Sequence, residues 1–227
     1  MDEELKSKYE EAIWTAKALF QHGIITGTTG NISFLHNKKM YITKSGSCLG
    51  KLDMDSFAIT DLNGNILFNK PSKEYIMHLA LYNSNETYKA IIHTHSFYTT
   101  LLSYNNHSHI DTPYMKLKNE KLKYIDYFPP GSKELFLAVE NSLEENNDTY
   151  ILEKHGIICA KDTLLSAFGT IEEIEYGAKL SFLLTEKKTK QVPLHRLDLF
   201  LLYLDKFMLL EFMILNTSSC VTTLKSC

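Results

Sequence analysis

A hairpin signature gives the clearest indication of the fold class: Ser56-Phe-Ala-Ile-Thr-Asp-Leu-Asn-Gly-Asn-Ile-Leu-Phe68. Two short apolar runs, 56–60 and 66–68, flank the segment Asp61-Leu-Asn-Gly64. Asn-Gly between two such runs is the strongest short-range signal for a tight turn between antiparallel strands. An antiparallel pair argues against an all-parallel sheet, so we expect a sheet that is mixed or antiparallel.

Strands and helices alternate on both sides of this hairpin. The expected strands begin near Ile32 and cover 40–43, 90–95, 149–152 and 156–160, and the expected helices cover 3–22, 71–82, 97–104, 132–143, 163–186 and 195–215. Residues 113–128 give no clear assignment, and no repeat or linker divides the chain. We therefore expect one α/β domain over residues 1–216, with helices on both faces of the central sheet, and a flexible tail over 217–227.

The charge of the chain argues against a nucleic-acid partner. The sequence has 24 Lys+Arg against 27 Asp+Glu, a formal net charge of −3, and no block of basic residues. A membrane partner is not expected either, because charged residues interrupt the one apolar-rich segment, 197–215. These residues are Asp198, Asp205, Lys206 and Glu211.

The cysteines and the amino terminus indicate a cytoplasmic protein. The 4 cysteines contain no Cys-x-x-Cys pair and no dense framework, which favours free thiols in a reducing compartment. The first residues, Met-Asp-Glu-Glu-Leu-Lys, are charged and lack the apolar stretch of a signal peptide.

Three histidines form the main candidate for a functional site. His93 and His95 lie in Ile-Ile-His-Thr-His, and in an extended strand residues i and i+2 project from the same face. His155, between two apolar strands and before Gly156, can supply a third imidazole and leave one coordination position open, as in catalytic metal sites. Taken alone, His-x-His is a weak signal, and one buried and one exposed imidazole would explain it better than a metal site.

Glu74 offers a carboxylate for proton transfer near such a site. It lies in the first turn of an expected helix, where acidic residues also occur simply because they stabilise the helix end. His78 follows one helical turn later. Packing is its expected role, and a contribution near the site is the alternative.

Three small loops carry groups that can bind an anion. They are Gly30-Asn31, Ser45-Gly46 and Ser72-Lys73, and each offers backbone amides or hydroxyls. Taken singly, each loop is better explained as an ordinary turn.

Together these segments resemble the class II aldolase family typified by L-fuculose-1-phosphate aldolase and ribulose-phosphate 4-epimerase. The resemblance runs from about residue 5 to 187. Its motifs, in order, are Thr-Gly-Thr-Thr-Gly-Asn-Ile-Ser (26–33), Thr-Lys-Ser-Gly (43–46), Lys-Pro-Ser-Lys-Glu (70–74), His-Thr-His (93–95) and His-Gly (155–156).

The resemblance implies a three-layer fold with one Zn²⁺ per subunit, another divalent metal being the alternative. The implied metal ligands are His93, His95 and His155, and the implied general acid/base is Glu74, with Tyr114 as a candidate helper. The implied phosphate-binding residues are Gly30, Asn31, Ser45, Gly46, Ser72 and Lys73. The family implies a homotetramer with active sites near subunit interfaces, acting on a small phosphorylated substrate.

Finer features are similar to the 3-oxo-tetronate 4-phosphate decarboxylases. They include Gly46-Ser-Cys-Leu-Gly-Lys-Leu-Asp53, Thr112-Pro-Tyr114 and Ile171-Glu-Glu-Ile-Glu175. Two departures stand beside them: Pro129 where that subgroup tends to carry arginine, and Lys44 where the family usually carries proline.

The resemblance therefore favours a zinc-dependent decarboxylase that forms dihydroxyacetone phosphate and CO₂ through an enediolate, which a metal ion stabilises as a Lewis acid. An L-fuculose-1-phosphate-type aldolase, which forms the same enediolate by retro-aldol cleavage, is the first alternative, and an epimerase is the next. A non-catalytic assembly module like the adducin head is the alternative outside enzymes, although a scaffold has no need for three histidines and Glu74.

Overall fold

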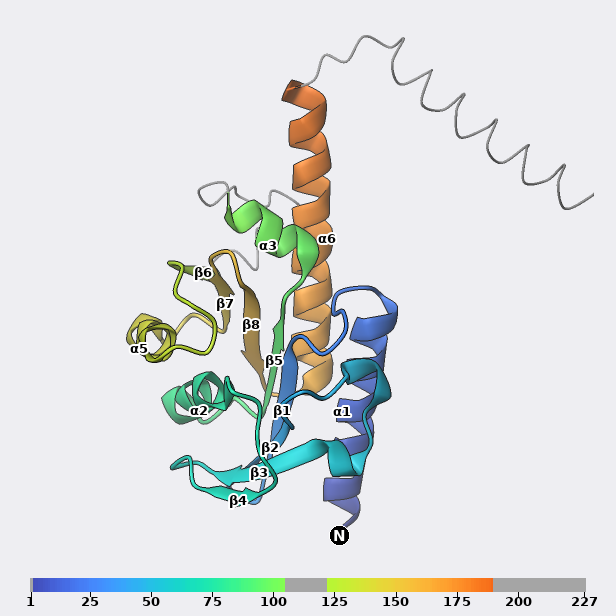
Figure 1. Ribbon diagram of the computed structural model, residues 1–227, viewed down its shortest axis with the longest axis vertical. Helices are drawn as coiled ribbons and strands as arrows, with labels where there is room; N and C mark the ends of the chain where they lie inside the picture. Colours follow the sequence, from blue (N-terminus) through green and yellow to red (C-terminus); the bar gives the residue numbers. More distant parts are fainter. Residues whose placement is uncertain (1, 105–121, 190–227) are drawn as a thin grey trace, which may run out of the picture. The chain divides into compact units, whose positions relative to one another are not determined.

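A central sheet organises the chain in the computed structural model, which describes residues 2–104 and 122–189 (Figure 1). Its strands are β1 Asn31–His36, β2 Lys39–Thr43, β3 Phe57–Asp61, β4 Ile66–Phe68, β5 Ala90–Thr94, β6 Leu122–Ile125, β7 Thr149–Leu152 and β8 Gly156–Lys161. Over the described residues these form one 8-stranded sheet in the order β4-β3-β2-β1-β5-β8-β7-β6. Only the β6–β7 pair is parallel. The expected mixed or antiparallel sheet is confirmed, and β6 falls within 113–128, the range for which no element was predicted.

The predicted hairpin joins β3 and β4 in antiparallel order. Its turn is longer than a two-residue Asn-Gly turn, because Asp61 N–H donates to the Asn65 carbonyl oxygen at 3.0 Å. The Asp61 carboxylate also accepts from the backbone N–H groups of Asn63 and Asn65, both at 2.9 Å. Gly64 provides the positive φ of 89° within this turn. The side chain of Asp61 therefore closes the turn that the sequence predicted.

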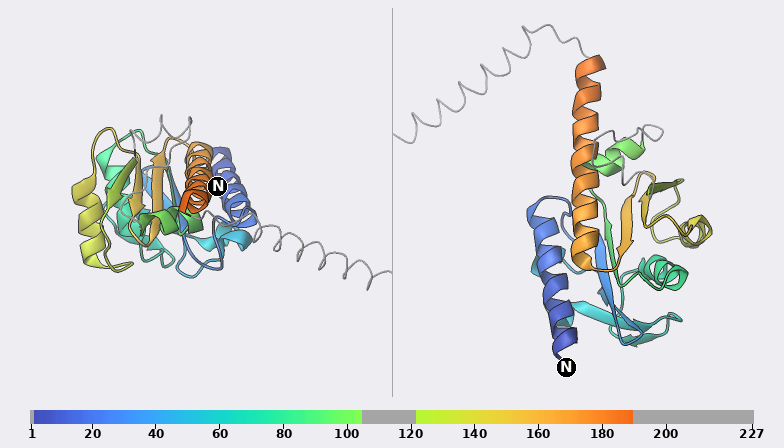
Figure 2. Two further views of the ribbon diagram at one scale, coloured as in Figure 1. Left: turned by 90° about the horizontal axis from the view of Figure 1, so that it is seen from above. Right: turned by 180° about the vertical axis from the view of Figure 1, so that it is seen from behind.

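Helices cover both faces of the sheet, as expected (Figure 2). The described α-helices are α1 Glu3–Gln21, α2 Tyr75–Ser84, α3 Phe97–Ser103, α5 Lys133–Ser142 and α6 Leu164–Thr189, and two short 3-10 helices cover η1 Leu49–Lys51 and η2 Met54–Ser56. One apolar core joins the sheet to α1 and α6 and includes Leu19, Ile32, Ile92 and Ile171. A second joins it to α2 and α5 and includes Met77, Leu81, Ile91 and Val139. Ile91 and Ile92 belong to different cores because successive strand residues point to opposite faces.

By its contacts the chain divides into two units, Met1–Phe182 and Leu183–Cys227. The sheet lies in the first unit. The expected helix over 195–215 and the expected tail over 217–227 lie outside the described residues, so the domain boundary at 216 stays a prediction. In the described ranges, no helix is long and apolar enough to cross a membrane.

Candidate metal centre

Four predicted side chains meet at one end of the central strands. His93 lies in β5, His95 follows the last residue of β5, and His155 lies between β7 and β8. Strands β5 and β8 run antiparallel with Thr94 opposite Ile157, so the end of β5 meets the beginning of β8. Glu74 is the residue immediately before α2. The sheet order therefore brings together residues that are up to 81 positions apart in sequence, from Glu74 to His155.

The ligand atoms of these four residues all lie within 4.8 Å of one another. His95 Nε2 lies 3.1 Å from His93 Nε2 and 3.1 Å from His155 Nε2. The Glu74 carboxylate lies 3.3 Å from His93 Nε2 and 3.1 Å from His155 Nε2. Two nitrogens bound to one zinc ion in a tetrahedral site are about 3.3 Å apart, given Zn–N bonds of about 2.0–2.1 Å. The donor set and its spacing thus fit a single divalent ion.

A hydrogen bond orients the His93 ring within the cluster. His93 Nδ1 lies 2.9 Å from the Ile157 carbonyl oxygen, which can only accept, so Nδ1 carries the hydrogen. In the neutral ring Nε2 then has the lone pair, and it points into the cluster. Donation of the second ring N–H to a backbone carbonyl is the usual support of a metal-binding histidine.

Two glycines permit the close approach of the strands at this end. A Cβ on Gly30, which has a φ of 73°, would lie 2.6 Å from the His93 carbonyl oxygen. A Cβ on Gly156 would lie 2.1 Å from the Thr94 carbonyl oxygen. Any other side chain at these two positions would push β5 away from its neighbours and spread the histidines.

Burial sets the protonation of the cluster. It lowers the pKa of His95 to about 3, together with electrostatic repulsion between the His95 and His93 rings, and it also lowers the pKa of His155. Burial by itself would raise the pKa of Glu74, but the His93 and His155 rings beside the carboxylate attract its anion whenever they carry an extra proton, and they hold that pKa well below its usual range. At neutral pH the cluster therefore offers lone pairs from His95 and His155 and a carboxylate anion.

The start of α3 is held by a residue that sequence reasoning did not place in the site. The Glu175 carboxylate, on α6, accepts from Tyr98 N–H at 2.8 Å and from Thr99 N–H at 2.9 Å. It also accepts from the Thr99 hydroxyl at 2.7 Å. Because α3 begins two residues after His95, this contact fixes the chain as it leaves the cluster.

The loop after β2 is tied to the segment that precedes α2. Ser45 N–H donates to the Lys70 carbonyl oxygen at 3.2 Å, and Ser72 N–H donates to the Thr43 carbonyl oxygen at 3.1 Å. Asn31, the first residue of β1, donates from Nδ2 to Ser72 Oγ at 3.1 Å and to Glu74 Oε2 at 3.0 Å. Two of the three loops predicted to bind an anion are thus joined to each other, and Asn31 of the third joins them to Glu74.

These loops line a pocket of about 310 Å³ beside the cluster. All six residues predicted to bind phosphate line it, as do Glu74 and His95. Tyr114 lies outside the described residues. The lining also includes residues that were not predicted as site residues: Thr28, Thr29, Lys44, Ser47, Pro130 and Gly131. The available signal for Thr28, Thr29 and Lys44 was their position inside the motifs at 26–33 and 43–46, and for Ser47 it was adjacency to the second motif. The departure at Pro129 was the signal for the last two.

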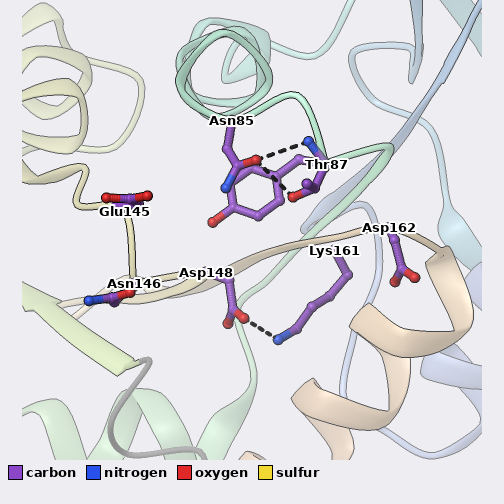
Figure 3. A pocket seen from close by; sticks show the side chains of 8 residues that line it. Asn85, Thr87, Glu145, Asn146, Asp148, Lys161 and Asp162 are labelled. Atoms are coloured by element: carbon purple, nitrogen blue, oxygen red, sulfur yellow. Dashed lines mark hydrogen bonds and ion pairs between the residues drawn. The ribbon is translucent and has the colours of Figure 1, made fainter.

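A larger hollow of about 590 Å³ lies at the other end of the same strands. Its lining includes Tyr88, just before β5, and Lys161, the last residue of β8. Figure 3 shows two contacts among its polar groups: Lys161 pairs with Asp148, and Asn85 accepts from the backbone N–H and hydroxyl of Thr87 at 2.9 and 2.8 Å. None of the predicted site residues lines this hollow.

Comparison with known proteins gives consistent matches. The family profile described as "Class II Aldolase and Adducin N-terminal domain" matches residues 10–182. The chain is 35% identical over 175 residues to the L-fuculose phosphate aldolase of Methanocaldococcus jannaschii, covering 77% of this chain and 95% of that protein. It is 34% identical over 189 residues to the 3-oxo-tetronate 4-phosphate decarboxylase of Haemophilus influenzae, covering 80% of this chain and 90% of that protein.

Solved structures agree with these sequence matches. The crystal structure of YgbL from Escherichia coli has a TM-score of 0.72 and 32% identity, covering 82% of this chain and 91% of that chain. An L-fuculose 1-phosphate aldolase structure has a TM-score of 0.68 and 28% identity, covering 82% of this chain and 89% of that chain.

Proposed function

The chain belongs to the class II aldolase and adducin N-terminal domain family and is a metal-dependent lyase, and within this family we propose a decarboxylase. Its proposed reaction converts a 3-oxo-tetronate 4-phosphate to dihydroxyacetone phosphate and CO₂. The observation that carries this proposal is the pair of lysines, Lys44 and Lys73, on the pocket that also contains Glu74 and His95. A keto-acid phosphate has two anionic ends, and two cationic side chains beside one metal cluster complement them. Pro130 and Gly131 also line this pocket and add no charge to it.

We propose that the metal is zinc, one ion per subunit, held by His93, His95 and His155. Three imidazole nitrogens with a nearby carboxylate are typical of zinc, and Glu74 is the residue left for proton transfer. When bound, the ion supplies Lewis acidity that stabilises negative charge on a ketone oxygen of the substrate.

The hydroxyl of Ser72 is oriented so that it can donate a hydrogen bond to the proposed phosphate group of the substrate. Ser72 Oγ accepts from Asn31 Nδ2 at 3.1 Å and lies 3.5 Å from the Glu74 N–H. Its own hydrogen is therefore directed away from these two donors, and Ser72 lines the pocket. With Lys73, Ser45 and the backbone of Gly46 it forms the proposed phosphate site.

Glu74 is proposed to move the proton. Decarboxylation breaks the bond between C1 and C2, releases CO₂ and leaves the electron pair of that bond delocalised over C2, C3 and the ketone oxygen. One proton from solvent is needed to complete the product, and Glu74 is the group proposed to pass it to C2. Tyr114 is proposed to assist.

The alternative is aldol cleavage of a ketose 1-phosphate such as L-fuculose 1-phosphate. The similarity to the Methanocaldococcus jannaschii aldolase, which is as high as that to the decarboxylase, favours it. The same electron pair would arise by breaking a carbon–carbon bond that releases an aldehyde instead of CO₂, with no net uptake of a proton.

A homotetramer and a cytoplasmic location also stay proposals. The tetramer rests on the family resemblance. The cytoplasmic location is supported by Cys48 and Cys159, the two cysteines within the described ranges, which are thiols rather than parts of a disulfide.

The test is to incubate zinc-loaded protein in D₂O, separately with 3-oxo-tetronate 4-phosphate and with L-fuculose 1-phosphate, and to measure CO₂ and dihydroxyacetone phosphate. We expect equal amounts of CO₂ and dihydroxyacetone phosphate from the keto acid, with one deuterium on the carbon that carried the carboxylate. Dihydroxyacetone phosphate formed only from L-fuculose 1-phosphate, without CO₂, would establish the aldolase instead. No turnover of either substrate by zinc-loaded protein would overturn both.

A further inference from the structure

A buried polar ladder joins α2 to β1 behind the metal cluster. His78 and Tyr82 are four residues apart, so they lie on one face of α2, and Glu74 precedes the helix at the same interval of four. Asn31 and Ser33 are two residues apart on β1, so they lie on one face of that strand. The two rows face each other, and hydrogen bonds connect every neighbouring pair between them.

The chemistry of the donors and acceptors gives this ladder a single direction. The Glu74 carboxylate can only accept, so the Asn31 atom at 3.0 Å from it must be the amide nitrogen. The second hydrogen of that nitrogen goes to Ser72 Oγ at 3.1 Å. Asn31 Oδ1 is then the atom that faces His78 Nε2 at 2.5 Å, and it can only accept, so His78 Nε2 carries a hydrogen.

The remaining bonds follow from that tautomer. With Nε2 protonated, Nδ1 of the neutral His78 ring is an acceptor, and it takes the hydrogen of Ser33 Oγ at 2.7 Å. Ser33 Oγ in turn accepts from the Tyr82 hydroxyl at 2.8 Å. Every hydrogen bond therefore donates toward Glu74, from Tyr82 through Ser33, His78 and Asn31.

Burial strengthens the preference for this single hydrogen-bond arrangement. The His78 and Ser33 side chains are completely buried, and Asn31 and Tyr82 are nearly so. Burial also lowers the pKa of His78 to about 3, so the ring is neutral at neutral pH, as the ladder requires. In such an environment an amide with unmatched partners costs far more than in water, because water cannot replace a lost hydrogen bond.

We propose that His78 is a positioning residue, whose Nε2–H holds the Asn31 amide in the orientation that presents its nitrogen to Glu74 and Ser72. The proposal rests on the proposed lyase function of that site. The Glu74 carboxylate favours the same orientation, because it can only accept. Without the Nε2–H, however, the buried Asn31 oxygen loses its donor in this ladder, so the amide is held from one side only and can turn away from Glu74. In the described residues the hydrogen bonds of the His78 ring go to Asn31 and Ser33, and His78 belongs neither to the four-residue cluster nor to the pocket lining, so it acts through Asn31.

Three substitutions of His78 separate this role from packing. The amide nitrogen of glutamine is as many bonds from Cα as Nε2 of histidine, whereas that of asparagine matches Nδ1. We expect His78→Leu and His78→Asn to lower kcat about 10- to 100-fold, as is usual for partners of site residues, with KM and the zinc Kd changed less than about threefold. We expect His78→Gln to restore kcat to within about threefold of the original protein.

Matched controls lie on the same helix. Tyr82→Phe removes the hydroxyl at the far end of the ladder and leaves the bond between His78 and Asn31 in place, so kcat should change less than about threefold. Leu81→Ala, at a buried apolar position, should lower Tm at least as much as His78→Leu and leave kcat of the folded protein nearly unchanged. Loss of kcat in Leu81→Ala comparable to that in His78→Leu would make the effect one of stability and overturn the proposal.

A double-mutant cycle tests the route through Asn31. In an Asn31→Ala background, His78→Leu should lower kcat by less than about twofold further, because the group it positions is gone. Two effects that multiply would show that His78 acts independently of Asn31, and this would overturn the proposal.

NMR provides a readout that needs no turnover. Spectra of the ring nitrogens should show hydrogen on Nε2 and none on Nδ1 of His78, with and without zinc. The side-chain amide hydrogens of Asn31 should exchange slowly in the original protein and in His78→Gln, and quickly in His78→Leu. The opposite tautomer, or unchanged exchange in His78→Leu, would overturn the proposal even if the substrate assignment holds. If neither substrate is turned over, these spectra still decide the role of His78, so the two failures are distinguishable.

Discussion

Gly156 lies so close to Thr94 that a Cβ on Gly156 would be 2.1 Å from the Thr94 carbonyl oxygen. The next residue along the chain from Thr94 is His95, and the residue before Gly156 is His155. The imidazoles of these two neighbours are 3.1 Å apart at Nε2. One backbone contact therefore sets the distance between two proposed metal ligands that are 60 residues apart in sequence.

Replacement of Gly156 should consequently weaken the metal site. We expect Gly156→Ala to lower zinc affinity by about tenfold or more and to lower the free energy of unfolding by about 1–3 kcal/mol, because the added methyl group forces β8 away from β5. Metal titration and urea unfolding measure the two effects. Gly169→Ala is the matched control, since apart from its chain neighbours and the backbone of its own helix, α6, no atom lies within 4 Å of its Cβ position, and alanine favours helices. A Gly156→Ala protein with normal zinc affinity would contradict this account of the site.

Glu74 should be separable from metal binding. We expect Glu74→Gln to retain one zinc per chain, since His93, His95 and His155 remain, and to lose turnover by about 10²- to 10⁴-fold, since glutamine cannot transfer a proton. Metal analysis and steady-state kinetics on the same preparation check this. Glu172→Gln, a change on the surface of α6 at a residue that pairs with His22, serves as the control for loss of one negative charge. Unchanged turnover in Glu74→Gln would remove the acid/base role.

The two pocket lysines should act mainly on substrate binding. We expect Lys44→Met and Lys73→Met each to raise KM about 10- to 100-fold, the range for loss of one hydrogen bond to a charged group, with a smaller change in kcat. Lys70→Met is the control, because Lys70 is exposed and close in sequence but is not part of the pocket lining. If Lys44→Met affected neither substrate, the argument for a substrate with two anionic ends would fail.

Acid should begin to destabilise the metal-free protein near pH 6.5, which is above the pH range in which carboxylates ordinarily titrate. His78 and His95 have pKa values lowered to about 3 in the folded protein, while in the unfolded chain they titrate near 6.5. The unfolded state therefore binds more protons between these values, so their contribution to stability is complete above pH 6.5 and is lost as the pH falls toward 3. Each group adds a slope of up to about 1.4 kcal/mol per pH unit.

Urea unfolding of metal-free protein at several pH values between 7 and 3.5 measures this dependence. His78→Gln should reduce the slope, since one titrating group is removed while its hydrogen bond to Asn31 is retained. A stability that stays level from pH 7 to pH 4 would show that these imidazoles are not held neutral by the fold.

Much of the fold could be predicted because its signals are local. The antiparallel hairpin at 56–68, the helix start at Ser132 and the strand at 90–95 each follow from turn chemistry, capping or periodicity within a few residues. Ser132 indeed accepts from the Leu135 N–H at 3.1 Å. Strand β6 escaped prediction because its four residues pair in parallel with β7, a partner distant in sequence.

The candidate metal ligands were likewise visible in the sequence, since His93 and His95 repeat at the period of a strand. The sequence did not show that they lie beside His155 and Glu74, because this depends on β8 lying next to β5 and on α2 beginning at the same end of the sheet. The role of His78 was hidden for the same reason. Its spacing from Glu74 is local, but its bonds to Asn31 and Ser33 exist only because α2 packs across β1. Backbone geometry sets which residues share a face, and long-range packing alone sets which faces meet.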